Sequence, residues 1–127
     1  PEEPCVGLFD GGVDASAWAC LARARAEGGF DLLGFAARKG LDFYARIRLV
    51  NFLREWRVRM GGSPDAAAVA AVVAQVEDVQ CFMDDRWLQP QVLDDPLLSA
   101  VDDPASDDDE AERQMIVDAV TEIFKVQ

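Results

Sequence analysis

The stretch Lys39–Arg54, KGLDFYARIRLVNFLR, decides the fold because it predicts a helix that is apolar on two sides. Phe43, Ile47, Val50 and Leu53 recur at helical spacing. A second seam on the same helix consists of Leu49, Phe52, Trp56 and Met60. A helix with two apolar seams packs between neighbours rather than lying on a surface. We therefore expect a central helix from about Leu41 to Met60, with Phe43, Ile47 and Val50 buried.

Glycines and capping residues on either side of this stretch predict further helices. We expect helices over 13–26, from a cap at Asp31 to Arg38, and over 66–79 after a cap at Ser63. A last helix follows the acidic run 107–110. Residues 1–12 read as a loop or short hairpin, and residues 84–106, rich in Asp and Pro, as mostly irregular. The fold class is therefore mainly α.

A narrow polar strip lies between the two apolar seams of the central helix. It is formed by Arg48, Asn51, Glu55 and Arg59. The strip has two interpretations: an exposed edge that binds a partner, or the ordinary solvent face of a core helix.

The charge of the chain is strongly uneven. Among its 127 residues, the formal net charge is −12. Residues 1–60 contain 9 basic and 8 acidic residues, whereas residues 61–127 contain 3 and 16. This balance argues against nucleic-acid binding, which requires clustered positive charge. An acidic half either attracts a basic protein or serves to keep the chain soluble.

The sequence also indicates the compartment. It has no apolar run long enough to span a membrane and no signal peptide at its start. Three cysteines, Cys5, Cys20 and Cys81, are an odd number and do not form a disulfide framework, so we expect a reducing, cytoplasmic setting. The absence of a starting Met is consistent with a piece of a longer protein.

The residue types predict little catalytic chemistry. The chain has no histidine, so a Cys-His or Ser-His pair cannot form within it. The acidic pairs at 84–85, 94–95 and 102–103 read as solvated loop residues rather than an acid–base or divalent-metal site. The glycine-rich phosphate-binding motifs of nucleotide sites are missing. We expect no catalytic residues and no cofactor in this chain.

A second motif, WLQPQVLDDPLL, lies at Trp87–Leu98 and can be interpreted together with the first motif at Lys39–Arg54. Together the two segments resemble the N-terminal substrate-recognition region of the protein arginine methyltransferase 3 family. In that family a C2H2-like zinc finger precedes a helix of the form HGLEFYxxIKLINFIR, and a segment like YLKPVLEDDLLL follows. The resemblance covers about residues 3–103. It implies a finger-like start packed on the central helix and two or three further helices.

The resemblance also implies a degenerate metal site. The family opens with Pro-Cys-x-x-Cys, and here Pro4 to Leu8 keep the first cysteine alone. Cys20 stands near the family's first histidine, and glycines stand at the second. Cys5 and Cys20 are thus vestigial ligand positions, and zinc is not expected, because a structural site needs about four ligands. Apolar residues would then replace the metal in the finger: Phe9, Trp18, Leu21, Phe30, Leu33 and Phe35.

The resemblance implies a function of recognition. The family's region binds a protein of the small ribosomal subunit for a separate domain that transfers methyl groups from S-adenosylmethionine to arginine. This chain, with residues 1–103 as recognition domain and 104–127 as acidic linker and C-terminal helix, would recruit such a basic protein. Candidate partner-binding residues are Arg48, Asn51, Glu55, Arg59, Asp94 and Asp95. The alternative is a free-standing adaptor or holding chaperone for a basic protein, with no enzyme attached.

Overall fold

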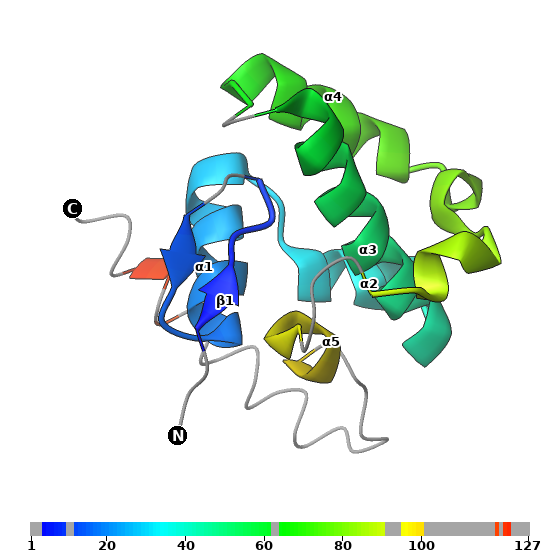
Figure 1. The fold of residues 1–127 in the computed structure, drawn as a ribbon, viewed down its shortest axis with the longest axis horizontal. Helices are drawn as coiled ribbons and strands as arrows, with labels where there is room; N and C mark the ends of the chain where they lie inside the picture. The colour runs from blue at the N-terminus through cyan, green and yellow to red at the C-terminus, as the bar shows by residue number, and fades with distance from the viewer. Residues whose placement is uncertain are drawn as a thin grey trace.

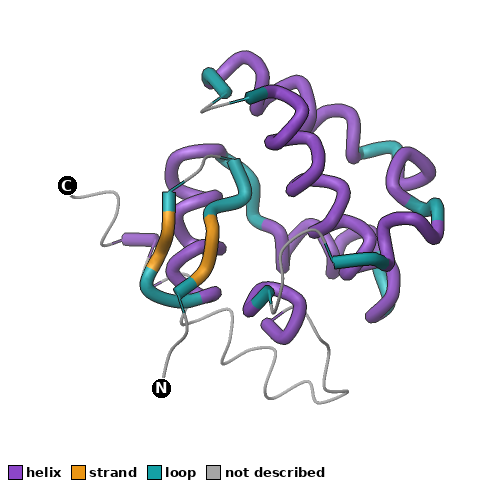
Figure 2. Tube along the Cα trace, in the orientation of Figure 1, coloured by secondary structure: helices purple, strands orange, loops and turns teal. Residues whose placement is uncertain are grey.

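The fold is mainly α-helical, with a two-stranded hairpin at its N-terminal end (Figures 1 and 2). The computed structural model describes residues 4–9, 12–61, 64–90, 95–100, 119 and 121–122. In these residues the predicted class is confirmed. The proposed domain boundary after residue 103 lies outside the described residues, as does most of the predicted last helix, of which Ala119, Thr121 and Glu122 are helical.

The N-terminal unit has the strand–strand–helix order of a C2H2 finger. Strand β1 (Cys5–Val6) pairs antiparallel with β2 (Val13–Asp14), so that Cys5 faces Asp14. Helix α1 (Ala17–Gly28) follows, and the hydroxyl of its N-cap Ser16 accepts a hydrogen bond from the Ala19 amide. The sequence offered Asp14 or Ser16 as the cap of this helix, and the structure confirms Ser16, whereas the predicted start at Val13 is wrong. Strand pairing holds Val13 and Asp14 instead, and Arg23 of α1 pairs with the Asp14 carboxylate at 2.7 Å.

Three capped helices continue the chain. Helix α2 (Leu32–Lys39) starts at its N-cap Asp31, as predicted, and α3 (Phe43–Met60) starts at its N-cap Asp42. Both α1 and α2 end at a glycine, Gly29 and Gly40, whose backbone is left-handed. Glycine adopts this conformation at little cost in free energy because it has no Cβ atom. Helix α4 (Ala66–Val76) takes its cap from Asp65 rather than from the predicted Ser63, and it ends three residues earlier than predicted.

The described part of the segment 84–106, predicted to be mostly irregular, contains short helices. The 3₁₀ helix η2 (Asp85–Leu88) and helix α5 (Pro96–Ala100) lie in it, and α5 packs against both α1 and α3. Another 3₁₀ helix, η1 (Val79–Phe82), lies between α4 and this segment. Aspartate side chains cap η1 and η2, at Asp78 and Asp84. The Asp and Pro content that indicated loops thus serves instead to start short helical turns.

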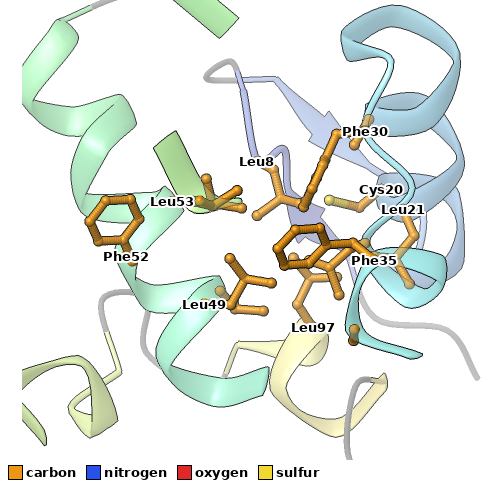
Figure 3. Close-up of a cluster of buried hydrophobic side chains, with 14 of the residues drawn as sticks. Leu8, Cys20, Leu21, Phe30, Phe35, Leu49, Phe52, Leu53 and Leu97 are labelled. Carbon is orange, nitrogen blue, oxygen red and sulfur yellow. The ribbon is translucent and has the colours of Figure 1, made fainter. Parts of the chain in front are cut away.

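One core joins the finger-like unit to the helices. Figure 3 shows Leu8 of the hairpin loop and side chains of α1, α2, α3 and α5 converging on a shared apolar cluster. Of the finger residues predicted to replace a metal, Leu21, Phe30 and Phe35 are buried. The other three, Phe9, Trp18 and Leu33, are partly buried against the same cluster.

Helix α3 is the central helix, as predicted, but its buried face differs from the prediction. Leu49, Val50 and Leu53 are fully buried. Ile47 is half-buried and Phe43 is exposed, so their predicted burial is wrong. Phe43 and Tyr44 lie on the solvent side of the first turn of α3, whereas Ala45 in the same turn is buried.

We expect Leu53→Ala to lower the free energy of unfolding by about 2–5 kcal/mol, because it leaves a cavity where a fully buried side chain stood. Val58→Ala is the matched control, since Val58 lies on the same helix with 63% of its surface exposed. This control should change stability by less than about 0.5 kcal/mol. Urea denaturation of both variants measures the difference, and similar losses in the two would contradict the assignment of α3 as the core helix.

Candidate functional site

A buried ion pair lies where the finger-like unit, α3 and α5 meet. The Arg54 side chain is 3% exposed and that of Asp95 is 0% exposed. Two parallel hydrogen bonds join them, from Nε to Oδ2 at 2.6 Å and from Nη2 to Oδ1 at 2.9 Å. Asp95 also accepts a hydrogen bond from the Leu97 amide at the start of α5. The pair therefore fixes α5 to α3 with the planar geometry that suits arginine and carboxylate.

The remaining donors of Arg54 bind the first strand. Nη1 donates to the carbonyl oxygens of Val6 at 2.9 Å and Gly7 at 3.4 Å. Nη2 also lies 3.6 Å from the sulfur of Cys5. Burial alone would lower the pKa of the Arg54 guanidinium, but the hydrogen bonds and charge of Asp95 more than offset burial, so that pKa lies above its usual value. Arg54 is thus a permanent buried cation.

Cys5 and Cys20, which the resemblance predicts to be vestigial ligand positions, meet beside this cation. Cys5 on β1 and Cys20 on α1 are each 1% exposed, and the Cys20 sulfur lies 3.4 Å from the Val6 carbonyl oxygen. A hydrogen bond from Cys20 lowers the pKa of the Cys5 thiol, and Arg54 acts in the same direction. That same hydrogen bond, together with burial, raises the pKa of Cys20. The structure thus brings these two predicted residues together.

The described residues contain no cluster of three or more histidine, cysteine or acidic side chains that could hold a metal ion. The absence of zinc stays a prediction.

The residue that sequence reasoning missed is Arg54, and a signal for it existed. Arg54 directly follows Leu53, the last member of the seam Phe43, Ile47, Val50 and Leu53, and lies four positions after Val50 on the same side of the helix. A charged residue at such a position is buried only together with a partner.

Helix η2 covers the middle of the predicted polar strip on α3. Asn51 is fully buried and donates a hydrogen bond from Nδ2 to the Trp87 carbonyl oxygen at 2.7 Å. Arg48 pairs with Asp85 at 2.6 Å, and Arg86 pairs with Glu55 at 3.4 Å. Trp87 itself packs edge-on against Phe52.

The six predicted partner-binding residues therefore separate into groups. Asn51 and Asp95 are buried and cannot contact a partner in this structure, so their assignment is corrected. Asp94 lies outside the described residues. Arg48 and Glu55 are partly exposed and Arg59 is exposed, and their role in partner binding stays a prediction.

A second electrostatic contact ties α2 to the end of α4. Glu77 accepts from Arg38 at 2.9 Å and pairs with Lys39 at 3.0 Å. These partners, Arg38 first, lower the pKa of Glu77 from its ordinary value of 4.5 to about 2. Arg38 and Glu77 line a shallow hollow of about 350 Å³ together with Phe30, Phe35 and Val73.

No protein-family model and no curated protein matches this chain. Within the described part of the chain, no helix is long and apolar enough to cross a membrane.

We expect Arg54→Met or Asp95→Leu alone to cost about 3–5 kcal/mol of stability, because each leaves an unpaired buried charge. The double variant should lose clearly less than the sum, since no charge is then stranded. Arg59→Met is the control, because Arg59 is 59% exposed and lies 3.9 Å from its partner Glu55. Additive losses in this double-mutant cycle would show that the two side chains do not interact as described.

We expect Glu77→Gln to be less stable than the wild type near neutral pH and equal to it at low pH. The folded carboxylate has the lower pKa, so its contribution is present above about 4.5 and is lost as pH falls toward about 2. Thermal melts of both proteins across this pH range show whether their stabilities become equal as the pH falls. As a control, about 1 M salt should shrink the neutral-pH difference, because the pair is exposed to screening. A difference independent of pH would contradict the ionic origin.

Proposed function

We propose that this chain is a protein-recognition module that recruits a basic protein, of the small ribosomal subunit, to an S-adenosylmethionine-dependent arginine methyltransferase. One observation carries the proposal: the two motifs that resemble the recognition region of that family interlock in the fold. Asn51 of the first motif binds the carbonyl of Trp87 in the second, and Arg54 of the first binds Asp95 of the second. The resemblance therefore falls on residues that depend on one another physically.

The charge of the chain supports a basic partner. A net charge of −12 attracts a cationic protein over distances of a Debye length, about 8 Å at physiological salt, and raises the rate of encounter. Ribosomal proteins are made in the cytoplasm, so the proposal also implies that compartment. The described residues present helical surface and buried ion pairs, which suits a role in which binding is performed here and methyl transfer is performed by another domain.

We expect the full 127-residue chain to bind at least one basic protein from a panel of small-subunit ribosomal proteins. Affinity should fall as salt rises, because acidic residues steer the encounter. Replacing residues 107–110 by their amides should slow association with little change in dissociation. An acidic protein of similar size is the control for nonspecific binding. If no panel member binds at low salt by calorimetry, the proposal fails.

A further inference from the structure

Two buried cysteines from different elements lie side by side in the finger-like unit. The Cys5 sulfur of β1 lies 3.6 Å from the Val6 carbonyl oxygen, and the Cys20 sulfur of α1 lies 3.4 Å from the same oxygen. A hydrogen bond from the Cys20 thiol to the Cys5 sulfur joins the two side chains. Both cysteines are free thiols, and each is 1% exposed. The packing of β1 on α1 thus forms a dithiol that neither the fold nor the proposed function requires.

A buried cation distinguishes this dithiol from cysteines that only fill an apolar core. Arg54 donates from Nη1 to the Val6 carbonyl at 2.9 Å, and its Nη2 lies 3.6 Å from the Cys5 sulfur. The hydrogen bond from Cys20 and the charge of Arg54 both lower the pKa of the Cys5 thiol. The thiolate is the reactive form of cysteine, and a neighbouring cation favours it. A cysteine that serves as a small apolar side chain needs no such neighbour.

The third cysteine of the described residues has a different environment. Cys81 lies in η1 and is half-buried, so more of it is exposed than of either member of the pair. Burial and the charge of Asp78 raise the pKa of the Cys81 thiol. Exposure and thiolate character therefore make opposite predictions. Cys81 reacts first if access alone decides, and the pair reacts first if chemistry decides.

A small cavity leads toward the pair from the outer side of α1. It has a volume of about 30 Å³, and Leu8, Cys20, Arg23 and Glu27 are among the residues that line it. The Glu27 side chain is 60% exposed, so the cavity reaches from solvent to a residue of the dithiol. A site of this size holds a molecule as small as water. A hydroperoxide of similar size can therefore approach Cys20, whereas a bulky oxidant cannot.

We propose that Cys5 and Cys20 form a reversible disulfide, with hydrogen peroxide as the oxidant. One thiolate of the pair attacks a peroxide oxygen, so that an S–O bond forms, the O–O bond breaks, and the leaving hydroxide takes up a proton to become water. The second sulfur then attacks the resulting sulfenic sulfur, forming the S–S bond and releasing the second water. In sum, two thiols lose two protons and two electrons, and one peroxide becomes two waters.

The new bond would join β1 to α1 covalently. The neighbouring second thiol captures the sulfenic acid before further oxidation, and a thiol reductant restores the dithiol by exchange. Such a transient disulfide is the form that disulfides take in a reducing compartment. The inference goes beyond the proposed function and does not depend on it, since the chemistry needs no partner protein.

The test uses the full, folded chain with hydrogen peroxide at neutral pH. Cys81→Ser is the starting variant, because it leaves Cys5 and Cys20 as the only thiols of the chain. Adding Cys5→Ser or Cys20→Ser to it removes one member of the pair. The matched control is Cys5→Ser/Cys20→Ser, which leaves Cys81 alone. Circular dichroism verifies the fold of each variant, and oxidised glutathione serves as the bulky oxidant.

We expect intact-mass measurement of Cys81→Ser to show the loss of two hydrogens, and peptide mapping to locate the bond between Cys5 and Cys20. Dithiothreitol should reverse the change. The pair should react about tenfold or more faster with peroxide than Cys81 does in the control variant, as a lowered thiol pKa predicts. Each variant with one member of the pair should stop at an adduct with a sulfenic-acid trap. Oxidised glutathione should react slowly with folded Cys81→Ser and faster after unfolding in urea.

Three results would contradict the inference. If peroxide forms the disulfide only in urea, the fold keeps the two sulfurs apart or inaccessible. If Cys81 reacts as fast as the pair, exposure alone decides and the buried cation confers nothing. If Cys81→Ser takes up oxygen atoms instead of losing two hydrogens, the two sulfurs do not reach each other. None of these measurements uses a partner protein, so each result leaves the proposed function to its own test.

Discussion

The buried guanidinium of Arg54 is the constraint on which the rest of this structure depends. It binds the Asp95 carboxylate, the carbonyls of β1 and the sulfur of Cys5, so one side chain joins α3, α5 and the hairpin. Removing the partner of a buried cation lowers the stability of the fold, because an unpaired buried charge costs several kcal/mol of folding free energy. The positions of these elements are therefore coupled. We interpret the Arg54–Asp95 pair as fixing one arrangement of α3, α5 and the hairpin rather than as adding net stability. The attraction within a buried ion pair often only offsets the free-energy cost of its desolvation.

The finger-like unit illustrates how a small motif can depend on its surroundings. A free-standing C2H2 finger has too small a core to fold without its metal. Here the two cysteines are buried beside a positive charge supplied by α3, and the hairpin packs on apolar side chains from α1, α2 and α5 (Figure 3). Phe9 and Phe30 meet edge to face, and Phe9 also meets Trp56 of α3. The hairpin and α1 thus pack on the apolar core that they share with α2, α3 and α5.

Much of the fold could be predicted from local signals, and the parts that could not share one physical cause. Asp31, Gly29 and Gly40 mark helix ends through backbone chemistry that acts within a few residues. Seam spacing identified α3 as central, but burial of Phe43 depends on whether a neighbour reaches the first turn, which spacing does not record. Asn51 and Asp95 were assigned to a surface because polar residues are usually exposed. Their partners, the Trp87 carbonyl and Arg54, are 36 and 41 residues away in the sequence.

Different residues of the two motifs therefore have different roles, some holding the fold together and others remaining exposed. Arg54 and Asn51 are positions where the fold joins itself, so similarity there supports a shared architecture more directly than a shared ligand. A recognition surface must instead use side chains that the fold positions and leaves uncovered. Phe43 and Tyr44 meet that condition, since Asp42 fixes their helical turn and no described element covers them. Within one helix, the residues that lock the structure and the residues available to a partner thus lie at opposite ends of the same motif.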